Sequence, residues 1–386
     1  MSPQPLSGVR LLDLSRLLPG PYCTMLLADM GAEVVKVETP RIGDYARFLP
    51  PEVGLGGLFA AVNRNKKSIA LNYRNPRGKE VFLRLAQTAD VILEGFRPGV
   101  VDRMGIGYEA VRAVNPKVIY CSLSGYGQSG PYRDRAGHDP NYLSVAGLLG
   151  LNGAAGGPPV LPAAPIADLA GGMLAAIAIL GALVGRERTG EGHATRLDVS
   201  LIDAVASWTA PVAGGQYFST GKAPERGRLA LTGEFPCYNI YETADGQFVT
   251  LAALEPDFWS AFCKVTDRAD LTPRQFDHAA IAEVAAVFKG RPRAGWLAAF
   301  ESTDGCVEPV STFEEMLQAP HLRQRGLVVE REGRAERLGS PLVSFRRDDD
   351  APPPALGGNT IEILKQAGMS EEEIKELEAK GIVKSA

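Results

Sequence analysis

The chain has 386 residues, of which 45% are hydrophobic and 22% are charged, and its net charge at pH 7 is −4. This composition is that of an ordinary globular protein, and the length suits two or three domains, or one large domain with a smaller one. With a pI near 5.8, no global positive field draws the chain to nucleic acid or to an acidic membrane surface. A phosphate-bearing ligand would therefore need a local basic patch.

Cysteine usage and the N-terminal sequence indicate a reducing compartment. The five cysteines are widely separated and include no Cys-x-x-Cys pair, which argues against a disulfide framework and against a zinc site. The first residues lack a basic segment followed by an apolar one, so no secretory signal is expected. The longest apolar stretch, Met173–Val184, is too short for a membrane span and predicts a buried helix. We expect a cytoplasmic protein.

The first 120 residues alternate between strand-like and helix-like segments. Strands are predicted at Val9–Leu14, Ala32–Val37, Ser68–Leu71, Val91–Leu93 and Lys117–Ser122, and helices at Pro21–Met30 and Arg77–Thr88. This alternation predicts an α/β fold with a parallel, doubly wound sheet. Pro19-Gly20-Pro21 stands between a strand and a helix, but the Gly-x-Gly-x-x-Gly fingerprint is absent, so NAD or FAD binding is not expected.

The second half of the chain begins with a Gly/Pro-rich loop, Asn152–Pro165, and a predicted helix from Asp168 to about Arg186. Leu197–Val212 is also helical by spacing. From about Phe235 the pattern changes to that of a smaller α+β unit. Its strands are predicted at Cys237–Tyr241, Phe248–Ala252 and Gly305–Val310, and its helices at Pro256–Thr266 and Ala280–Phe288.

The last part of the chain contains a linker and a clearly marked helix. Arg346–Pro354 has the composition of a linker. Ser370 and Glu373 form a capping box that predicts the start of the C-terminal helix, and Gly381 predicts its end.

His138 is the histidine with the strongest case for chemistry. It lies in Arg135–Tyr142 (RAGHDPNY), directly after the glycine-rich segment Ser124–Pro131. Gly137 allows a close backbone approach, and Asp139 supplies a polar partner. The residues alone also allow an ordinary turn with a satisfied histidine. The other three histidines lie in polar contexts and no pair has metal-ligand spacing, so no metal is expected.

Asp168 opens an almost wholly apolar helix, and two roles are open for it. Aspartate is a favoured N-cap, and such a helix needs one. However, Gly171 and Gly172 are poor helix formers one turn later, which suggests that something large packs against the helix start. The free N–H groups there would also stabilise a developing oxyanion. From the residues alone, cap and catalyst are equal alternatives.

Together, these motifs resemble the family III CoA-transferase superfamily (CaiB/BaiF type), and within it most closely the α-methylacyl-CoA racemases. The matching segments are 6–38, 63–72, 91–109, 124–131, 135–142, 166–172, 241–249 and the C-terminal LGGNTIEIL and GMSEEEI. The resemblance implies a large Rossmann-like CoA-binding domain at 1–200, completed by 331–386. It also implies a connecting helix or linker at 201–224, a small α+β domain at 225–330, and an interlocked homodimer.

The same resemblance assigns roles to three side chains. Asp168 falls where transferases carry a nucleophilic aspartate and racemases carry one of two acid/base groups. His138 matches the racemase histidine, and Glu255 matches the glutamate that orients it. Only Gly233 stands in Arg228–Tyr238, where formyl-CoA-type transferases carry a glycine run. One departure is Ala164, where some racemases have an asparagine that supports the aspartate.

The expected reaction interconverts (R)- and (S)-2-methylacyl-CoA thioesters through an enolate. By resemblance, His138 serves the (S) substrate and Asp168 the (R), and N–H groups of the Asp168 helix or near Asp139 hold the enolate oxygen. The alternative is a family III CoA-transferase in which Asp168 forms a mixed anhydride and then an aspartyl-CoA thioester. A CoA-binding or assembly protein without turnover is a third reading.

The expected ligand is an acyl-CoA substrate, with no cofactor beyond the coenzyme A that belongs to it, and with no nucleic-acid or membrane partner. The residues expected to bind CoA are Lys66, Lys67, Leu71, Asn72, Arg74, Arg97, Arg103, Asp139 and Tyr142. The basic ones would pair with the phosphates, Leu71 and Asn72 would line the adenine site, and Asp139 and Tyr142 would face the pantetheine arm. The acyl group itself is not specified by these motifs.

Overall fold

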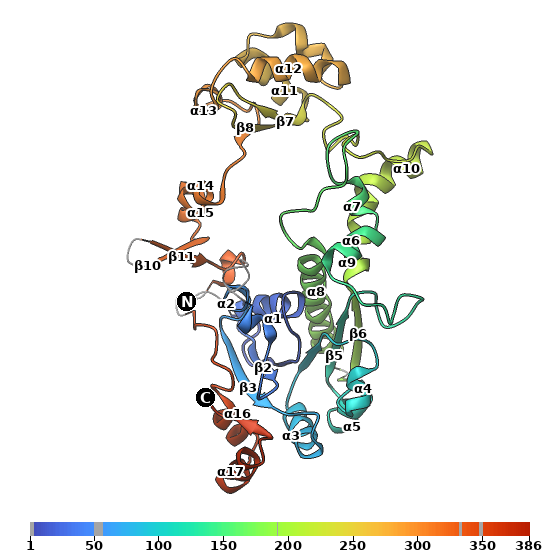
Figure 1. Cartoon of the computed structure of the whole chain (residues 1–386), viewed down its shortest axis with the longest axis vertical. Helices are drawn as coiled ribbons and strands as arrows, with labels where there is room; N and C mark the ends of the chain where they lie inside the picture. Colours follow the sequence, from blue (N-terminus) through green and yellow to red (C-terminus); the bar gives the residue numbers. More distant parts are fainter. Residues whose placement is uncertain (1–3, 50–56, 191, 332–333, 347–349) are drawn as a thin grey trace. The chain divides into compact units, whose positions relative to one another are not determined.

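The computed structural model describes residues 4–49, 57–190, 192–331, 334–346 and 350–386 (Figure 1). The chain divides into two compact units. Unit 1 comprises Met1–Ala146, Ala163–Ala206 and Gln324–Ala386, and unit 2 comprises Gly147–Pro162 and Ser207–Arg323. The segment 147–162 thus belongs to the smaller unit, although the large domain was expected to run without interruption to residue 200. Part of the expected linker, 347–349, lies outside the described residues.

Unit 1 is built on a seven-stranded sheet in the order β12-β3-β2-β1-β4-β5-β6. Its strands are β1 (Arg10–Asp13), β2 (Glu33–Glu38), β3 (Lys66–Leu71), β4 (Val91–Glu94), β5 (Ile119–Ser124), β6 (Thr195–Ser200) and β12 (Val383–Lys384). Neighbouring strands pair in parallel, except that β12 pairs antiparallel with β3, so the C-terminal tail completes the sheet. The predicted α/β class with a large parallel sheet is confirmed.

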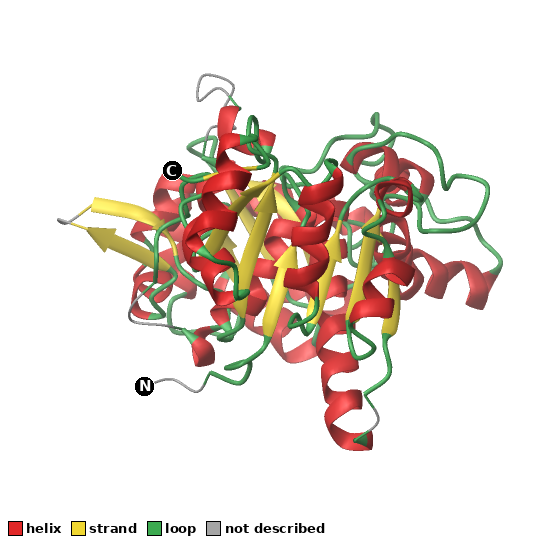
Figure 2. Ribbon diagram, turned by 90° about the horizontal axis from the view of Figure 1, so that it is seen from below, coloured by secondary structure: helices red, strands yellow, loops and turns green. Residues whose placement is uncertain are grey.

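Helices cover both faces of this sheet (Figure 2). One face carries the apolar side chains of Leu12, Val35 and Ile69, and it packs against the described helices α3 (Pro76–Ala86), α4 (Val100–Met104), α5 (Tyr108–Val114), α16 (Thr360–Gln366) and α17 (Glu371–Ala379). On the other face lie α1 (Pro19–Asp29) and α8 (Ile166–Thr189), which pack against each other. Because successive side chains of a strand alternate between faces, the second face receives Asp13 and Lys36.

Unit 2 is a small α+β unit with an aromatic core. Its antiparallel sheet has the order β7-β8-β9, formed by β7 (Tyr238–Glu242), β8 (Phe248–Ala252) and β9 (Val307–Pro309). The helices α11 (Pro256–Val265), α12 (Ile281–Phe288) and α13 (Arg293–Phe300) pack with it. The predicted strands and helices of this region lie within a few residues of these bounds.

The remaining α-helices and strands of the described chain are shorter elements. They are α2 (Leu58–Val62), α6 (Asp139–Val145), α7 (Leu148–Leu151), α9 (Leu201–Thr209), α10 (Gly215–Thr220), α14 (Phe313–Gln318), α15 (Pro320–Gln324), β10 (Val328–Arg331) and β11 (Arg334–Leu338). A π-helical turn, Ala210–Gly214, joins α9 to α10. The capping box at Ser370 is present, with the Ser370 hydroxyl accepting from the Glu373 N–H at 3.2 Å, as predicted.

Two local predictions were wrong. Leu197–Val212 is not one helix, because its first residues belong to β6, which pairs with β5 from Thr195 to Ser200. The helix that was predicted to start at Asp168 starts at Ile166 after Pro165, so Asp168 lies in the first turn and the N-cap alternative for it is excluded. Sheet pairing overrode the helical spacing in the first case, and an earlier helix start moved the aspartate inward in the second.

Within the described residues, α8 is long and apolar enough to cross a membrane by length and composition. One side of it packs against α1 and against strands β5 and β6, and Ile179 is fully buried there. This packing is that of a core helix.

Candidate active site

A pocket lies at the carboxyl edge of the unit 1 sheet, where the strand order reverses. The strands β1 and β4 are neighbours, but the chain leads from β1 toward β2 and β3 on one side and from β4 toward β5 and β6 on the other. In open parallel sheets this reversal leaves a crevice beyond the strand ends, which is the usual place of a ligand. The segments 14–17, 95–98 and 123–126, which follow β1, β4 and β5, line the pocket.

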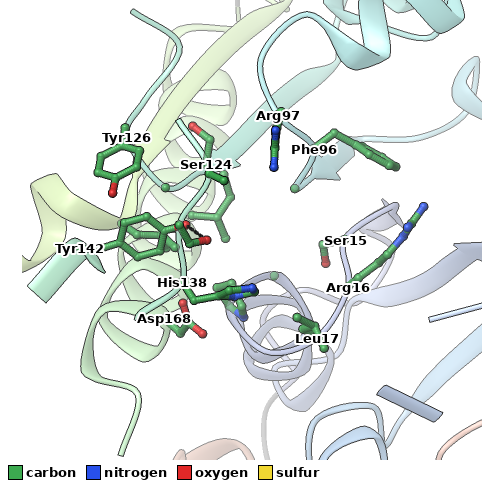
Figure 3. Close-up of a pocket in the computed structure, with 18 of the residues that line it drawn as sticks. Ser15, Arg16, Leu17, Phe96, Arg97, Ser124, Tyr126, His138, Tyr142 and Asp168 are labelled. Carbon is green, nitrogen blue, oxygen red and sulfur yellow. Dashed lines mark hydrogen bonds between the residues drawn. The ribbon is translucent and has the colours of Figure 1, made fainter. Parts of the chain in front are cut away.

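The pocket has a volume of about 400 Å³. A second group of side chains, on or next to the helices α6 and α8, lines its other side. His138, Tyr142 and Asp168 belong to this group, and Figure 3 shows His138 and Asp168 at the same end of the pocket. His138 directly precedes α6, whereas Asp168 lies in the first turn of α8. Two elements far apart in sequence therefore bring an imidazole and a carboxyl group into one cavity.

Asp168 has an environment that favours its neutral form. Burial raises the pKa of this carboxyl from 3.8 to about 7, and the nearby Asp139 carboxylate adds to the rise. A carboxyl group with such a pKa is present in both protonation states near neutral pH. It can therefore act as an acid and as a base under the same conditions.

Asp139 supplies the helix cap, which was one of the two alternative roles of Asp168. Its Oδ1 accepts hydrogen bonds from the backbone N–H groups of Ala167 (2.6 Å) and Asp168 (3.2 Å) in the first turn of α8. Asp139 is buried and is not among the residues that line the pocket, and its contact with a pantetheine arm stays a prediction. These two N–H groups are already bonded, so they are not available to an enolate oxygen.

His138 is held through hydrogen bonds of its backbone with Asn141. Its N–H donates to Asn141 Oδ1 at 2.9 Å, and its carbonyl accepts from the Asn141 N–H at 2.8 Å. These bonds fix the start of α6, while the exposed side chain lines the pocket. The ring is thus carried on a defined backbone at the edge of the cavity.

The two glycines of α8 allow neighbouring parts of the protein, rather than a ligand, to pack closely against the helix. A Cβ on Gly171 would lie 2.1 Å from Leu201 Cδ2, and one on Gly172 would lie 2.5 Å from the Pro19 carbonyl oxygen. Neither distance is compatible with a side chain, so the glycines permit the close packing of α8 on α1 and α9. This packing fixes the helix turn that carries Asp168.

Tyr142 forms the wall of the pocket beside Asp168. Its hydroxyl donates to the Gly137 carbonyl oxygen at 2.5 Å, and its ring packs edge-on against Tyr126 at 5.0 Å between centroids. Burial, together with the Asp168 charge, raises the pKa of Tyr142 to about 12, so it stays protonated. As predicted it faces the pocket, where its bond to Gly137 also braces the residue before His138.

The pocket contains four arginines, of which only Arg97 had been expected to bind CoA. The other three are Arg16, Arg133 and Arg135. Arg16 lies over the Phe96 ring at 5.1 Å and donates to the Tyr73 hydroxyl at 3.2 Å. This concentration of positive charge provides the local basic patch that a chain of net charge −4 needs for a phosphate-bearing ligand. Their positions after the carboxyl ends of predicted strands were the signal that could have identified them.

Two expected CoA-binding residues are buried inside unit 1. The Lys66 ammonium donates to the Pro21 carbonyl oxygen and to Asn63 Oδ1, each at 2.9 Å, and its side chain is fully buried. Leu71 is fully buried in the core on the opposite face of the sheet. Neither side chain lines the pocket. Strand alternation places them on opposite faces of the sheet, and helices cover both faces. The structure therefore does not support a contact between Lys66 and a phosphate.

The remaining expected CoA-binding residues lie outside the pocket lining. Lys67 pairs with Glu362 at 2.7 Å, and Asn72 is half-buried with its N–H bonded to the Ile382 carbonyl oxygen at 2.7 Å. Arg74 and Arg103 are exposed on unit 1. Contacts of these four residues with CoA stay predictions.

Glu255 belongs to unit 2, where it directly precedes α11. His138 belongs to unit 1, so the predicted hydrogen bond between them stays a prediction. In the described part of the chain, no group of three or more His, Cys, Asp and Glu side chains is arranged to hold a metal ion.

Comparison with known proteins identifies the family of the chain. The sequence model of CoA-transferase family III matches residues 6–360. Human α-methylacyl-CoA racemase is 37% identical, with 98% of both chains covered, and human succinyl-CoA:glutarate CoA-transferase is 34% identical, with 98% of this chain and 90% of the relative covered. A solved CaiB/BaiF family protein from Brucella suis superposes with a TM-score of 0.79 at 29% identity, covering 95% of this chain and all of that one. The chain therefore belongs to CoA-transferase family III.

Proposed function

We propose that this chain is a racemase of 2-methylacyl-CoA thioesters. The observation that carries the proposal is that His138 and Asp168 line one pocket together with four arginines. A racemase must remove a weakly acidic proton beside the thioester carbonyl and return one to the opposite face of the same carbon. Two acid/base groups on different elements suit that task.

The pKa of Asp168, raised to about 7, supports this assignment. In one direction Asp168 takes the α-proton as a carboxylate and His138, as imidazolium, returns one to the other face. In the reverse direction the neutral imidazole takes the proton and the protonated Asp168 returns one. Both directions need both groups to change protonation state near neutral pH, and the buried carboxyl meets that need.

The enolate oxygen requires a hydrogen-bond donor other than the first turn of α8. The N–H groups of Ala167 and Asp168 are bonded to Asp139. The backbone N–H of Asp139, at the first position of α6, has no partner within its helix by geometry and is a candidate, because it follows His138, which lines the pocket. It adjoins His138, so the donor and one acid/base group would lie on consecutive residues.

The decisive experiment is solvent deuterium exchange at the α-carbon of (R)- and (S)-2-methylacyl-CoA, followed by mass spectrometry and chiral analysis. The proposal expects deuterium incorporation from both enantiomers together with loss of optical purity. His138→Gln should abolish exchange from one enantiomer more strongly than from the other. Absence of exchange from every branched acyl-CoA in a panel would refute the racemase function.

A CoA-transferase is the second candidate, and relatives with that activity support it at similar identity. Succinyl-CoA:glutarate and succinyl-CoA:mesaconate CoA-transferases, from human and from Haloarcula marismortui, are both 34% identical to the chain. In this mechanism the Asp168 carboxylate attacks the thioester carbonyl and expels CoA thiolate, which leaves a mixed anhydride. The thiolate then attacks the aspartyl carbon of the anhydride and releases the donor carboxylate, which leaves an aspartyl-CoA thioester. Hydroxylamine trapping or an added CoA mass on Asp168 would identify it, and CoA binding with neither exchange nor transfer would identify a protein without turnover.

The proposed racemase uses no cofactor beyond the CoA of its substrate, and it works in the cytoplasm as a homodimer. Exposed apolar side chains on α8 support a second copy, since Ile177 is 63% and Val184 is 56% exposed on a helix whose other side is packed. Light scattering should give twice the chain mass of 41.2 kDa. A monomer that is fully active would contradict the dimer.

A further inference from the structure

Five charged side chains are buried beneath one wall of the pocket. They are Asp13, Lys36, Glu38, Asp44 and Lys66, each at most 5% exposed. Burying charge costs free energy unless each charge is paired and hydrogen-bonded. None of these groups lines the pocket, so the proposed proton transfers do not use them.

The pocket wall above them is a strained loop. Ser15, Arg16 and Leu17 follow β1 and line the pocket, and Leu17 has φ +62°. A leucine rarely adopts this left-handed conformation, because its Cβ crowds the backbone there. Something must hold Leu17 in place, since the loop alone would favour a negative φ.

Asp44 is placed to hold it. Both of its carboxylate oxygens accept from the Leu17 N–H, each at 3.2 Å. The same carboxylate pairs with the Lys36 ammonium at 3.0 Å, with both side chains fully buried, and Lys36 donates to the Ser15 carbonyl oxygen at 3.0 Å. One ion pair therefore hydrogen-bonds the loop backbone on both sides of Arg16, at Ser15 and at Leu17.

Two of the other buried charges, Asp13 and Lys66, fix the ends of this loop. Asp13 accepts from the Ser15 N–H at 2.9 Å and from the Thr24 hydroxyl of α1 at 2.7 Å. Lys66 lies 3.5 Å from Asp13 and donates to Pro21 in the first turn of α1. The carboxyl end of β1, the loop and the start of α1 are thus tied to β2 and β3 beneath them.

We propose that the buried Lys36–Asp44 ion pair is a positioning device, which keeps Leu17 in its left-handed conformation and so presents Arg16 to the CoA part of the substrate. The inference rests on the proposed function, because it takes an acyl-CoA as the ligand of this pocket. Neither Lys36 nor Asp44 touches the ligand; both act through the loop. Loss of the pair loosens substrate binding, while His138 and Asp168, which are carried by α6 and α8, keep their geometry.

The test is a double-mutant cycle between Asp44 and Leu17. Asp44→Asn should raise KM in the deuterium-exchange assay, and the dissociation constant of free CoA by calorimetry, by about tenfold, with kcat changed less than about threefold. In a Leu17→Gly background the same change should cost less than about threefold, because glycine adopts positive φ without strain. In the cycle the effect of losing the Leu17 side chain itself cancels, so the difference between the two backgrounds reports only the coupling between Asp44 and Leu17.

A matched control is available in the same unit. Asp29 and Arg64 form another buried ion pair, with side chains 1% and 7% exposed, and neither residue lines the pocket. Asp29→Asn should lower thermal stability and leave KM and CoA affinity unchanged. Were Asp44→Asn not to fold, Lys36→Met/Asp44→Leu would remove both charges together, and the cycle would be run with it.

The proposal is overturned if folded Asp44→Asn keeps wild-type KM and CoA affinity, or if the cost is the same with leucine and glycine at position 17. A wild-type protein that binds CoA but exchanges no α-proton refutes the racemase function alone. In that case the CoA dissociation constants still decide the positioning role. A wild-type protein that binds no CoA refutes both.

Discussion

The two units of this protein use buried polar groups very differently. All nine buried charged residues of the described chain lie in unit 1: Asp13, Asp29, Lys36, Glu38, Asp44, Arg64, Lys66, Glu94 and Asp139. In unit 2 the buried polar residues within the described chain are neutral, Thr243 and Gln275. Its core is instead built from aromatic rings packed on one another, such as Trp259, Phe262 and Phe288.

This difference separates stability from function. An aromatic core gains free energy by removing apolar area from water and by ring stacking, and it needs no partner for a charge. Buried charges gain little net stability but fix geometry when every partner is in place. Most of the unit 1 charges lie at the carboxyl edge of the sheet or beneath it, where the pocket is. We expect substitutions there to affect activity more than stability, and the reverse in unit 2.

The largest effect is expected at Asp168. Asp168→Asn should reduce α-proton exchange by about a thousandfold or more, because asparagine transfers no proton. The same substitution should increase the stability of the folded state at neutral and higher pH. Since burial raises the pKa of the folded carboxyl to about 7 from 3.8, the folded state holds the proton more tightly, and stability falls as the pH rises from about 4 to 7.

At pH 8 the carboxylate opposes folding, so Asp168→Asn should increase the free energy of unfolding by about 2 kcal/mol there, and the gain should disappear below about pH 4. Denaturant unfolding at the two pH values measures it. Equal stability of wild type and variant at pH 8 would show that burial of the Asp168 carboxylate does not destabilise the folded state.

The next largest effect is expected in the aromatic core. Phe262 stacks on Trp259 at 5.0 Å and on Phe300 at 6.1 Å between ring centroids. Phe262→Ala should lower the stability of unit 2 by about 3 kcal/mol, through lost burial and a cavity. All three tryptophans lie in unit 2, so tryptophan fluorescence follows its unfolding. A loss below about 1 kcal/mol would contradict a rigid stacked core.

A smaller effect is expected at Asp139, where stability and function meet. Asp139→Ala removes the acceptor for two N–H groups of α8 and should cost about 1–2 kcal/mol of unit 1 stability. Asp139→Asn keeps an acceptor oxygen but removes the charge that contributes to the raised pKa of Asp168. The exchange rate that depends on Asp168 as base rises with pH through about 7 in wild type, and its midpoint should move to lower pH in this variant. An unchanged midpoint would exclude the Asp139 charge as a cause.

The smallest effect is expected at Ser370, which caps α17 away from the pocket. Ser370→Ala removes the same kind of bond that Asp139 makes, a side-chain acceptor for a helix N–H. It should cost about 1 kcal/mol or less, because the site is exposed to water, with kcat and KM unchanged. A change in kcat or KM would show that a helix cap outside the pocket also affects catalysis.

Much of the fold followed from local sequence. The strands β1 to β5 were located because short apolar runs alternate with helical spacing, and the start of α17 was located because Ser370 and Glu373 bond only to their own helix turn. The predicted presence of Arg97, His138, Tyr142 and Asp168 at a ligand site agrees with the pocket lining. Such features depend on neighbours within a few residues, and those neighbours are visible in the sequence.

The tertiary structure decided what depends on contacts between distant segments. Asp139 caps a helix that begins 27 residues later, and only the packing of α6 on α8 shows it. Lys66 was expected at a phosphate, but strand pairing turns it toward Asp13 and Pro21 inside the protein. The pocket arginines come from loops that meet only because parallel strands end at one edge. Sequence spacing specifies on which face of its own element a residue lies. The partner that it contacts is set by how the elements pack against one another in the fold.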